Sequence, residues 1–134
     1  MIVRDFMTEM IVTAETDTPV VEAAKLMAVE DIGSLIVTKG DVLVGLVTRK
    51  DIIGSQLLSE DTYKSLLLEE IMTSPVVTIG ADADLGQTIA LMNQTGCKCV
   101  PVMDRDTVVG VVSASDIIRV LATMKHIADG GPIE

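Results

Sequence analysis

The chain has very few aromatic, cysteine and histidine residues. Among its 134 residues there are no Trp, one Phe, one Tyr, two Cys and one His, whereas 49% are apolar. Val, Ile, Leu and Met must therefore fill any interior. The single histidine, His126, has no Ser/His/Asp, Cys/His or metal-ligand set to accompany it. The sequence thus gives little support to an enzyme.

Long apolar runs and an excess of positive charge are also missing. No stretch reaches the roughly eighteen apolar residues of a membrane span, and charged residues interrupt positions 1–10, unlike a secretory signal. The net charge of −10 lacks the basic footprint that nonspecific nucleic-acid binding needs. We therefore expect a cytoplasmic protein with no nucleic-acid or membrane partner. A small anionic ligand remains compatible, because a helix N-terminus and one or two cations can hold a phosphate.

The two cysteines do not indicate a disulfide or a metal site. Cys97 and Cys99 are too close in the sequence for an easy disulfide. No second pair of metal ligands accompanies them, so no metal is expected. Cys97 corresponds to Ile32 in the duplication described next, which favours a small core residue.

The most informative feature that is present is an internal duplication. A shift of 65 places residues 7–53 on residues 72–118 without a gap, and fifteen of the forty-seven pairs are identical. Chance would give about three identities at ordinary residue usage. A copy of about sixty residues would be marginally stable alone. We therefore expect two copies of one unit that share a core.

Each copy is predicted to begin with a strand and a helix. In the first copy, residues 10–13 form a short apolar run before a polar turn at residues 14–17. Thr18 is a good N-cap and Pro19 suits the first helical position, and Asp84 is the expected cap in the second copy. The apolar residues at helical spacing are Val20, Ala24 and Met27 in one copy and Leu85, Ile89 and Met92 in the other.

A β-hairpin and a second helix complete each copy. Runs rich in β-branched residues occupy residues 35–38 and 42–48, and again residues 100–103 and 108–113, with hairpin turn chemistry between them. The second helix is expected to begin near Thr48 or Ser113. Each copy is therefore predicted to fold as β-α-β-β-α. The fold class is α/β, with two repeats related by an approximate two-fold axis.

The predicted domain boundaries follow the duplication. The first repeat spans residues 1–58, a linker residues 59–65 and the second repeat residues 66–128. Residues 66–71 are expected to lead into the second repeat as residues 3–6 lead into the first. Gly130, Gly131 and Pro132 indicate a flexible tail over residues 129–134.

Short motifs that occur in both copies point to a known family. Each copy has Met-Thr, an apolar run ending in Thr, and a helix. Then follow Ser-Leu-Ile-Val or Cys-Val-Pro-Val, and Gly-Leu-Val-Thr-Arg-Lys-Asp-Ile or Gly-Val-Val-Ser-Ala-Ser-Asp-Ile. The chain resembles a tandem pair of CBS domains, a Bateman module, from about Val3 to about His126. It is similar to the stand-alone CBS-pair proteins of archaea and bacteria.

The resemblance implies an adenosine-containing ligand, such as AMP, ADP, ATP or S-adenosylmethionine, in clefts between the two repeats. In the family the acid of Thr/Ser-x-x-Asp holds the ribose hydroxyls, which implies this role for Asp51 and Asp116. The hydroxyl three residues earlier lies near the ribose or phosphate, which implies Thr48 and Ser113. A carboxylate can accept hydrogen bonds from both hydroxyls of a vicinal diol, and the helix N-terminus beside it offers N–H groups to a phosphate.

A purely structural role is open for the same four residues. They fit a capping box, in which the hydroxyl caps the helix and the acid reaches back to the N–H of the cap. The motif alone is weak evidence for a ligand. Its occurrence twice within a CBS framework favours a ligand role for at least one copy.

Basic and apolar residues near the motif would complete the site. The resemblance implies phosphate contacts from Lys50, from the adjacent Arg49, and from Lys98 before the second strand of the second copy. The structural alternative is that Lys50 and Arg49 are solvated, although cations in the first turn of a helix oppose its dipole. The residues expected against the base are Ile11, Val12, Val76 and Val77 of the first strands, which are core residues on the alternative interpretation.

The two sites are not expected to be equivalent. The second copy has Ala114 and Ser115 where the first has Arg49 and Lys50. A phosphate-bearing nucleotide is therefore expected to favour the site that contains Asp51. The other site is expected to be empty or to take a less charged adenosine derivative.

The leading functional hypothesis is a non-enzymatic regulatory sensor that binds an adenosyl ligand and signals to an unidentified regulated protein. The alternative is a structural dimerisation module whose clefts bind nothing. A homodimer is expected, because the small core and apolar helices leave surface to cover. No cofactor other than the ligand is expected.

Overall fold

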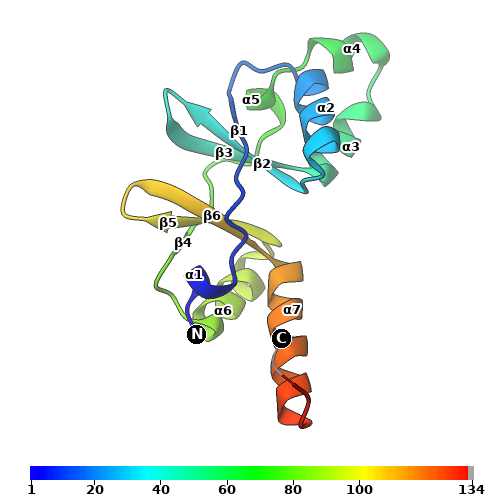
Figure 1. Cartoon of the computed structure of the whole chain (residues 1–134). Helices are drawn as coiled ribbons and strands as arrows, with labels where there is room; N and C mark the ends of the chain where they lie inside the picture. The colour runs from blue at the N-terminus through cyan, green and yellow to red at the C-terminus, as the bar shows by residue number, and fades with distance from the viewer. Residues whose placement is uncertain (133–134) are drawn as a thin grey trace. The chain divides into compact units, whose positions relative to one another are not determined.

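Two copies of the β-α-β-β-α arrangement are present in the computed structural model, which describes residues 1–132 (Figure 1). The elements are α1 (Val3–Phe6), β1 (Thr13–Glu15), α2 (Val20–Glu30), β2 (Ser34–Lys39), β3 (Val42–Thr48), α3 (Arg49–Gln56), α4 (Glu60–Ser65), α5 (Leu68–Ile71), β4 (Ile79–Gly80), α6 (Leu85–Thr95), β5 (Cys99–Asp104), β6 (Thr107–Ser113) and α7 (Ala114–Ala128). Strands β1-β2-β3 form one sheet and β4-β5-β6 form the other. In each sheet the first strand is parallel to the second, and the second is antiparallel to the third. The predicted α/β fold class is confirmed.

The two sheets have the same register, as a duplication requires. Ser34 pairs with Thr48 in one sheet, and Cys99 pairs with Ser113 in the other. The register shifts at the equivalent place in both, directly after Val37 and directly after Val102. Such a shift is typical of a β-bulge, in which one strand has an extra residue opposite its partner. Its presence in both copies shows that the duplication extends to the details of the hydrogen bonding.

Hairpin turns lie where they were predicted, and each consists of two residues. Gly40 and Asp41 have φ values of 57° and 66°, and Arg105 has a φ of 57°. Positive φ values in a two-residue loop match the right-handed twist of the strands. Beside the first turn, the Glu15 carboxylate accepts hydrogen bonds from the Thr38 hydroxyl and from the Gly40 N–H. These two bonds hold the pKa of Glu15 below its usual range.

The chain divides into two compact units whose boundaries cut across the sequence repeats. The first-repeat unit is Ile11–Val76, and the second-repeat unit is Met1–Met10 together with the chain from Val77 onward. Helix α5 therefore packs in the unit of the repeat before it, and α1 packs in the unit of the second repeat. The contacts are equivalent: the Thr73 N–H donates to the Leu46 carbonyl at 2.9 Å, and the Thr8 N–H donates to the Val111 carbonyl at 2.8 Å.

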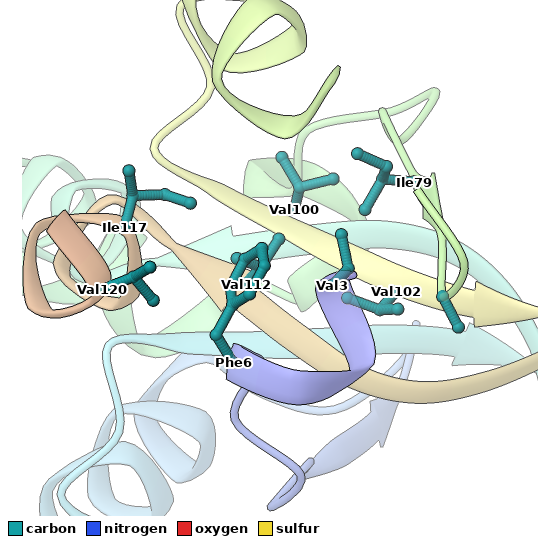
Figure 2. Packing of buried hydrophobic residues seen from close by; sticks show 9 residues of the cluster. Val3, Phe6, Ile79, Val100, Val102, Val112, Ile117 and Val120 are labelled. Carbon is teal, nitrogen blue, oxygen red and sulfur yellow. The ribbon is translucent and has the colours of Figure 1, made fainter. Parts of the chain in front are cut away.

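Each unit has its own cluster of buried apolar side chains, so the expected single shared core is wrong. In the second-repeat unit, Val3 and Phe6 of α1 gather with Val112 of β6 and with Ile117 and Val120 of α7 (Figure 2). In the first-repeat unit the buried residues are Val20, Ala23, Met27, Leu35, Val37, Val47, Ile52 and Leu68. Leu68 of α5 and Val3 of α1 are equivalent in the duplication, and both are fully buried. The lead-in helices thus supply apolar surface that each small unit needs.

The first helices of the two copies, α2 and α6, begin in different ways. Helix α6 begins after Asp84, whose carboxylate accepts the Gln87 N–H at 2.7 Å, as predicted. Helix α2 begins one residue later than predicted, with Pro19 as its N-cap and no side-chain cap, so Thr18 does not have the predicted capping role. The carbonyl of Leu66 accepts the Val20 N–H at 2.9 Å. A backbone partner from the chain before α5 thus replaces the expected hydroxyl.

One residue of the predicted apolar stripe of α6 does not face the core. Ile89 is 39% exposed, whereas its neighbour Thr88 is 1% exposed. The Thr88 hydroxyl donates to the Asp84 carbonyl at 2.8 Å, so its polar group is satisfied within the helix. Thr88 therefore faces the core with its hydroxyl paired, and Ile89 lies outside.

Two further predicted segments differ from the structure, and a third lies partly outside the described residues. The first strands begin at Thr13 and Ile79, later than the predicted apolar runs, because the ladders to the neighbouring strands close only there. The segment predicted as a linker, residues 59–65, contains α4, which Ser59 caps by accepting the Thr62 N–H. Part of the predicted flexible tail, residues 133–134, lies outside the described residues.

Candidate functional site

The Thr-x-x-Asp motif of the first repeat lies where β3 passes into α3. The Asp51 Oδ2 atom accepts the Thr48 N–H at 2.9 Å and the Thr48 hydroxyl at 3.1 Å. The Thr48 hydroxyl oxygen lies 3.4 Å from the Asp51 N–H that it caps. The pair therefore forms a capping box, which fixes the carboxylate over the first turn of α3.

The Ser-x-x-Asp motif of the second repeat forms the same box at the start of α7. The Asp116 Oδ2 atom accepts the Ser113 N–H at 2.9 Å and the Ser113 hydroxyl at 3.1 Å. Two further groups reach its other oxygen, Oδ1: the Arg119 guanidinium at 2.9 Å and the Thr8 hydroxyl at 3.2 Å. The Asp116 side chain is only 2% exposed. Both carboxylate oxygens of Asp116 thus accept hydrogen bonds from protein groups, and the side chain is almost inaccessible to solvent.

The two equivalent carboxylates therefore differ in availability. Within the described part of the chain, every hydrogen bond to the Asp51 side chain ends on Oδ2, and Asp51 is half-buried. No side-chain oxygen in that part is both buried and without a partner. The Asp51 Oδ1 atom accordingly reaches solvent with its acceptor capacity unused. A carboxylate oxygen in that position can accept a hydrogen bond from a ligand hydroxyl.

The basic residues predicted at the site are exposed, and they lie in different surroundings. Lys50 lies in the first turn of α3, and no ion pair within residues 1–132 holds it. The Arg49 guanidinium instead lies 3.5 Å from the Asp31 carboxylate at the end of α2. Lys98 lies beside the start of α7, because its carbonyl accepts the Ala114 N–H at 2.8 Å. A phosphate role for each residue stays a prediction.

The four residues predicted to contact a base are half-buried. Ile11, Val12, Val76 and Val77 lie in the segments just before β1 and β4, so their predicted placement on the first strands is wrong. Val12 packs against the core of the first-repeat unit, and Val77 packs against the core of the second-repeat unit. The packing of Val12 and Val77 agrees with a structural role for these two residues. Each of the four residues is nevertheless partly accessible to solvent.

An open hollow of about 410 Å³ lies between α2 and α3, within the first-repeat unit. It is lined by Ala24, Met27, Ala28, Asp31, Ile32, Arg49, Ile52 and Ile53. Neither Thr48 nor Asp51 lines this hollow. Its apolar walls belong to helix faces, so the hollow does not identify the ligand site.

Residues 1–132 contain neither a cluster of metal ligands nor a membrane-spanning helix. Nowhere in residues 1–132 do three His, Cys, Asp or Glu side chains gather in a way that could hold a metal ion. No helix there has both the length and the apolar character to cross a bilayer. Cys97 packs partly buried against the core of the second-repeat unit, as expected.

Sequence reasoning missed two residues that contact Asp116. Arg119 lies three residues after Asp116, a spacing that places both side chains on one face of a helix. That spacing could have identified Arg119 from the sequence alone. Thr8 lies 108 residues away from Asp116 in the chain. No local pattern could have found it.

With the motifs placed at the two strand-to-helix junctions, the comparison with known proteins decides the family. The sequence matches the CBS domain family twice, over residues 3–57 and 68–123. The chain belongs to the CBS domain family. The two matches coincide with the duplicated β-α-β-β-α repeats, so the chain contains a CBS pair.

Solved CBS structures resemble the chain over most of its length. The CBS domain pair of protein MJ0100, solved in complex with 5′-methylthioadenosine and S-adenosyl-L-methionine, is 29% identical, with a TM-score of 0.81. The match covers 91% of this chain and 96% of that one. In sequence, the CBS domain-containing protein YhcV of Bacillus subtilis is 27% identical over 86% of this chain and 81% of that protein.

Enzymes are also among the relatives, but only a part of each is matched. The homoserine O-acetyltransferase of Methanohalobium evestigatum is 37% identical over 89% of this chain. The chain spans 24% of that enzyme, and 22% of an inosine-5′-monophosphate dehydrogenase of Thermoplasma acidophilum. What the chain shares with these enzymes is therefore a CBS pair that makes up about a quarter of each.

Proposed function

We propose that this CBS pair is a non-enzymatic regulatory module that binds an adenosine-containing ligand and signals its presence to a partner protein. The candidate ligands are AMP, ADP, ATP and S-adenosylmethionine. The proposal is supported by the related CBS pair that was solved with 5′-methylthioadenosine and S-adenosyl-L-methionine. The two ligands of that relative both contain adenosine.

The observation that carries the proposal is the accessible carboxylate oxygen of Asp51. The capping box holds Oδ2, which fixes the carboxylate, and Oδ1 remains open to solvent. A ribose offers two neighbouring hydroxyls as donors, and a carboxylate that is already oriented loses little freedom when it accepts them. We therefore assign the ribose contact to Asp51, with Thr48 beside it.

Charge favours a phosphate near the same place. Lys50 is exposed in the first turn of α3, where the helix dipole already attracts anions. The N–H groups of Thr48, Arg49 and Asp51 already donate within the protein, so the Lys50 N–H is the backbone donor that this turn can add. We propose that Lys50 contacts the phosphate, with Arg49 and Lys98 as further cations. The half-buried Ile11, Val12, Val76 and Val77 are the proposed contacts for the base.

Isothermal titration calorimetry of the chain with AMP, ADP, ATP and S-adenosylmethionine tests this function. Binding of at least one of the four is expected. Asp51→Asn should weaken that binding about tenfold to a hundredfold, because a hydrogen bond to a charged group contributes about 1.5–3 kcal/mol. Asp17→Asn is the matched control, since Asp17 is exposed and lies in the same unit.

Two results would count against the proposal. Absence of heat for all four compounds would reject adenosine sensing. Equal weakening by Asp51→Asn and Asp17→Asn would show that only net charge matters, and would remove Asp51 from the site. Transfer of the signal would be tested by comparing limited proteolysis with and without the ligand that binds. A ligand can shift a conformational equilibrium only if it prefers one conformation.

A structural association module is the second candidate, and exposed apolar helix residues favour it. Val29 is 80% exposed, Ile53 59%, Leu57 83% and Ile118 67%. A homodimer would cover such residues, and two-fold dimers are the commonest assembly. We propose a homodimer. Light scattering should give twice the mass of one chain, and Ile53→Glu with Ile118→Glu should give the monomer mass.

A further inference from the structure

The duplication supplies an internal comparison between the two motif carboxylates. The Asp51 Oδ1 atom has no hydrogen-bond partner among residues 1–132, whereas the Asp116 Oδ1 atom accepts from Arg119 and Thr8. Both carboxylates use Oδ2 in the same way for the capping box. The two carboxylates therefore differ chiefly at Oδ1, since at Oδ2 the second repeat adds only the Thr8 hydroxyl at 3.4 Å.

One residue accounts for most of this difference. Arg119 in α7 corresponds to Gly54 in α3, so only the second repeat has a cation three residues after the motif acid. Its guanidinium lies 2.9 Å from Asp116 Oδ1 and remains 68% exposed. The Thr8 hydroxyl, at 3.2 Å, belongs to an exposed residue and can rotate toward water. Arg119 is thus the group that holds this oxygen.

We propose that Arg119 is a specificity-determining residue that closes the second site to a ribose. This inference rests on the proposed function. A vicinal diol needs carboxylate acceptors in good geometry, and the guanidinium already occupies the position that is free in Asp51. The chain therefore binds one adenosine at the first-repeat motif, and Asp116 serves as a structural capping residue.

The first repeat has an equivalent position, Gly54, at which an arginine should have the same effect on Asp51. A Cβ atom added at Gly54 would meet nothing within 4 Å, so a longer side chain has room at that position. An arginine there would have the same three-residue spacing from Asp51 that Arg119 has from Asp116. Gly54→Arg should therefore close the first site, and Arg119→Ala should open the second.

Calorimetric titration with adenosine tests the proposal, because adenosine has the diol and no phosphate. The unchanged chain should bind one adenosine per chain, and Asp51→Asn should weaken this binding about tenfold to a hundredfold. Arg119→Ala should bind two, and a further Asp116→Asn substitution should return the number to one. Gly54→Arg should bind none at adenosine concentrations that saturate the unchanged chain. Arg105→Asn removes a positive charge from an exposed hairpin turn of the same unit, and should still bind one.

The outcomes separate this inference from the proposed function. One adenosine per chain before and after Arg119→Ala would overturn the inference and leave the proposed function intact. Two per unchanged chain, or weaker binding after Arg119→Ala, would also overturn it, the latter by making Arg119 a ligand contact. No binding to any variant would reject both. Far-UV circular dichroism of every variant would show that it remains folded.

Discussion

Replacing Asp116 by alanine should destabilise the second-repeat unit more than the equivalent change, Asp51→Ala, destabilises the first-repeat unit. Both substitutions remove the carboxylate that accepts the N–H of the capping residue. The carboxylate of Asp116 is buried, whereas Asp51 is half-buried and water can replace its acceptor. The loss of the same hydrogen bond should therefore have unequal consequences.

The expected magnitude follows from the bonds that are lost. A hydrogen bond from the Ser113 N–H to a charged, buried acceptor contributes about 1.5–3 kcal/mol. The pair with Arg119, which is 68% exposed, adds at most about 1 kcal/mol because solvent screens it. Arg119 and Thr8 can both turn to water, so no buried charge is left unpaired. We expect a loss of about 3 kcal/mol for Asp116→Ala, and about 1 kcal/mol, a typical cap effect, for Asp51→Ala.

Urea unfolding followed by far-UV circular dichroism is the appropriate assay. The chain has no Trp and only one Tyr, so fluorescence would report little. Asp116→Asn is the conservative control, because its amide oxygen can still accept the Ser113 N–H. Its loss of stability should therefore be about half of the loss for Asp116→Ala. Equal losses for Asp116→Ala and Asp51→Ala would refute the argument. So would a loss below about 1 kcal/mol for Asp116→Ala.

Three further predictions concern stability. Gly110→Ala should lower the free energy of unfolding by about 2–3 kcal/mol, because the added Cβ would lie 2.8 Å from the backbone carbonyl oxygen of Thr8. The equivalent change, Gly45→Ala, should lower it by about 1 kcal/mol, because the nearest atoms to the added Cβ belong to the side chain of Met72, which can move. Equal midpoints in urea would contradict this difference. Asp31→Gly should raise the free energy of unfolding by about 1 kcal/mol, since Asp31 ends α2 with a φ of 51° and the equivalent residue of the second repeat is glycine; an unchanged or lower thermal midpoint would argue against strain there. Glu15 has a lowered pKa, so its contribution to stability is complete above its unfolded pKa and is lost as pH falls through the lower folded pKa. The stability of Glu15→Gln, followed by urea unfolding from pH 7 to pH 3, should therefore decline less on acidification than that of the unchanged chain, and parallel curves would exclude the effect.

Local sequence determined the repeated elements and some of their ends. The hairpin turn at Gly40 and Asp41 and the cap at Asp84 all formed as predicted, because each depends on backbone conformations and hydrogen bonds within a few residues. The motif hydroxyl and acid likewise formed capping boxes in both repeats. The duplication allowed each element to be predicted twice, which is why the family and the α/β class could be inferred from the sequence.

The tertiary structure decided which segments pack together. Met7-Thr8 and Met72-Thr73 are identical dipeptides, and the two sheets have the same register, so the sequence could not assign either dipeptide to a sheet. Their long-range pairing places Thr8 against Asp116 and buries that carboxylate. Local patterns specify local hydrogen bonds, whereas burial depends on contacts between distant segments. The sequence therefore identified two candidate carboxylates and predicted that their sites differ, whereas only the tertiary structure showed that Asp116 is buried and that Asp51 is half-buried.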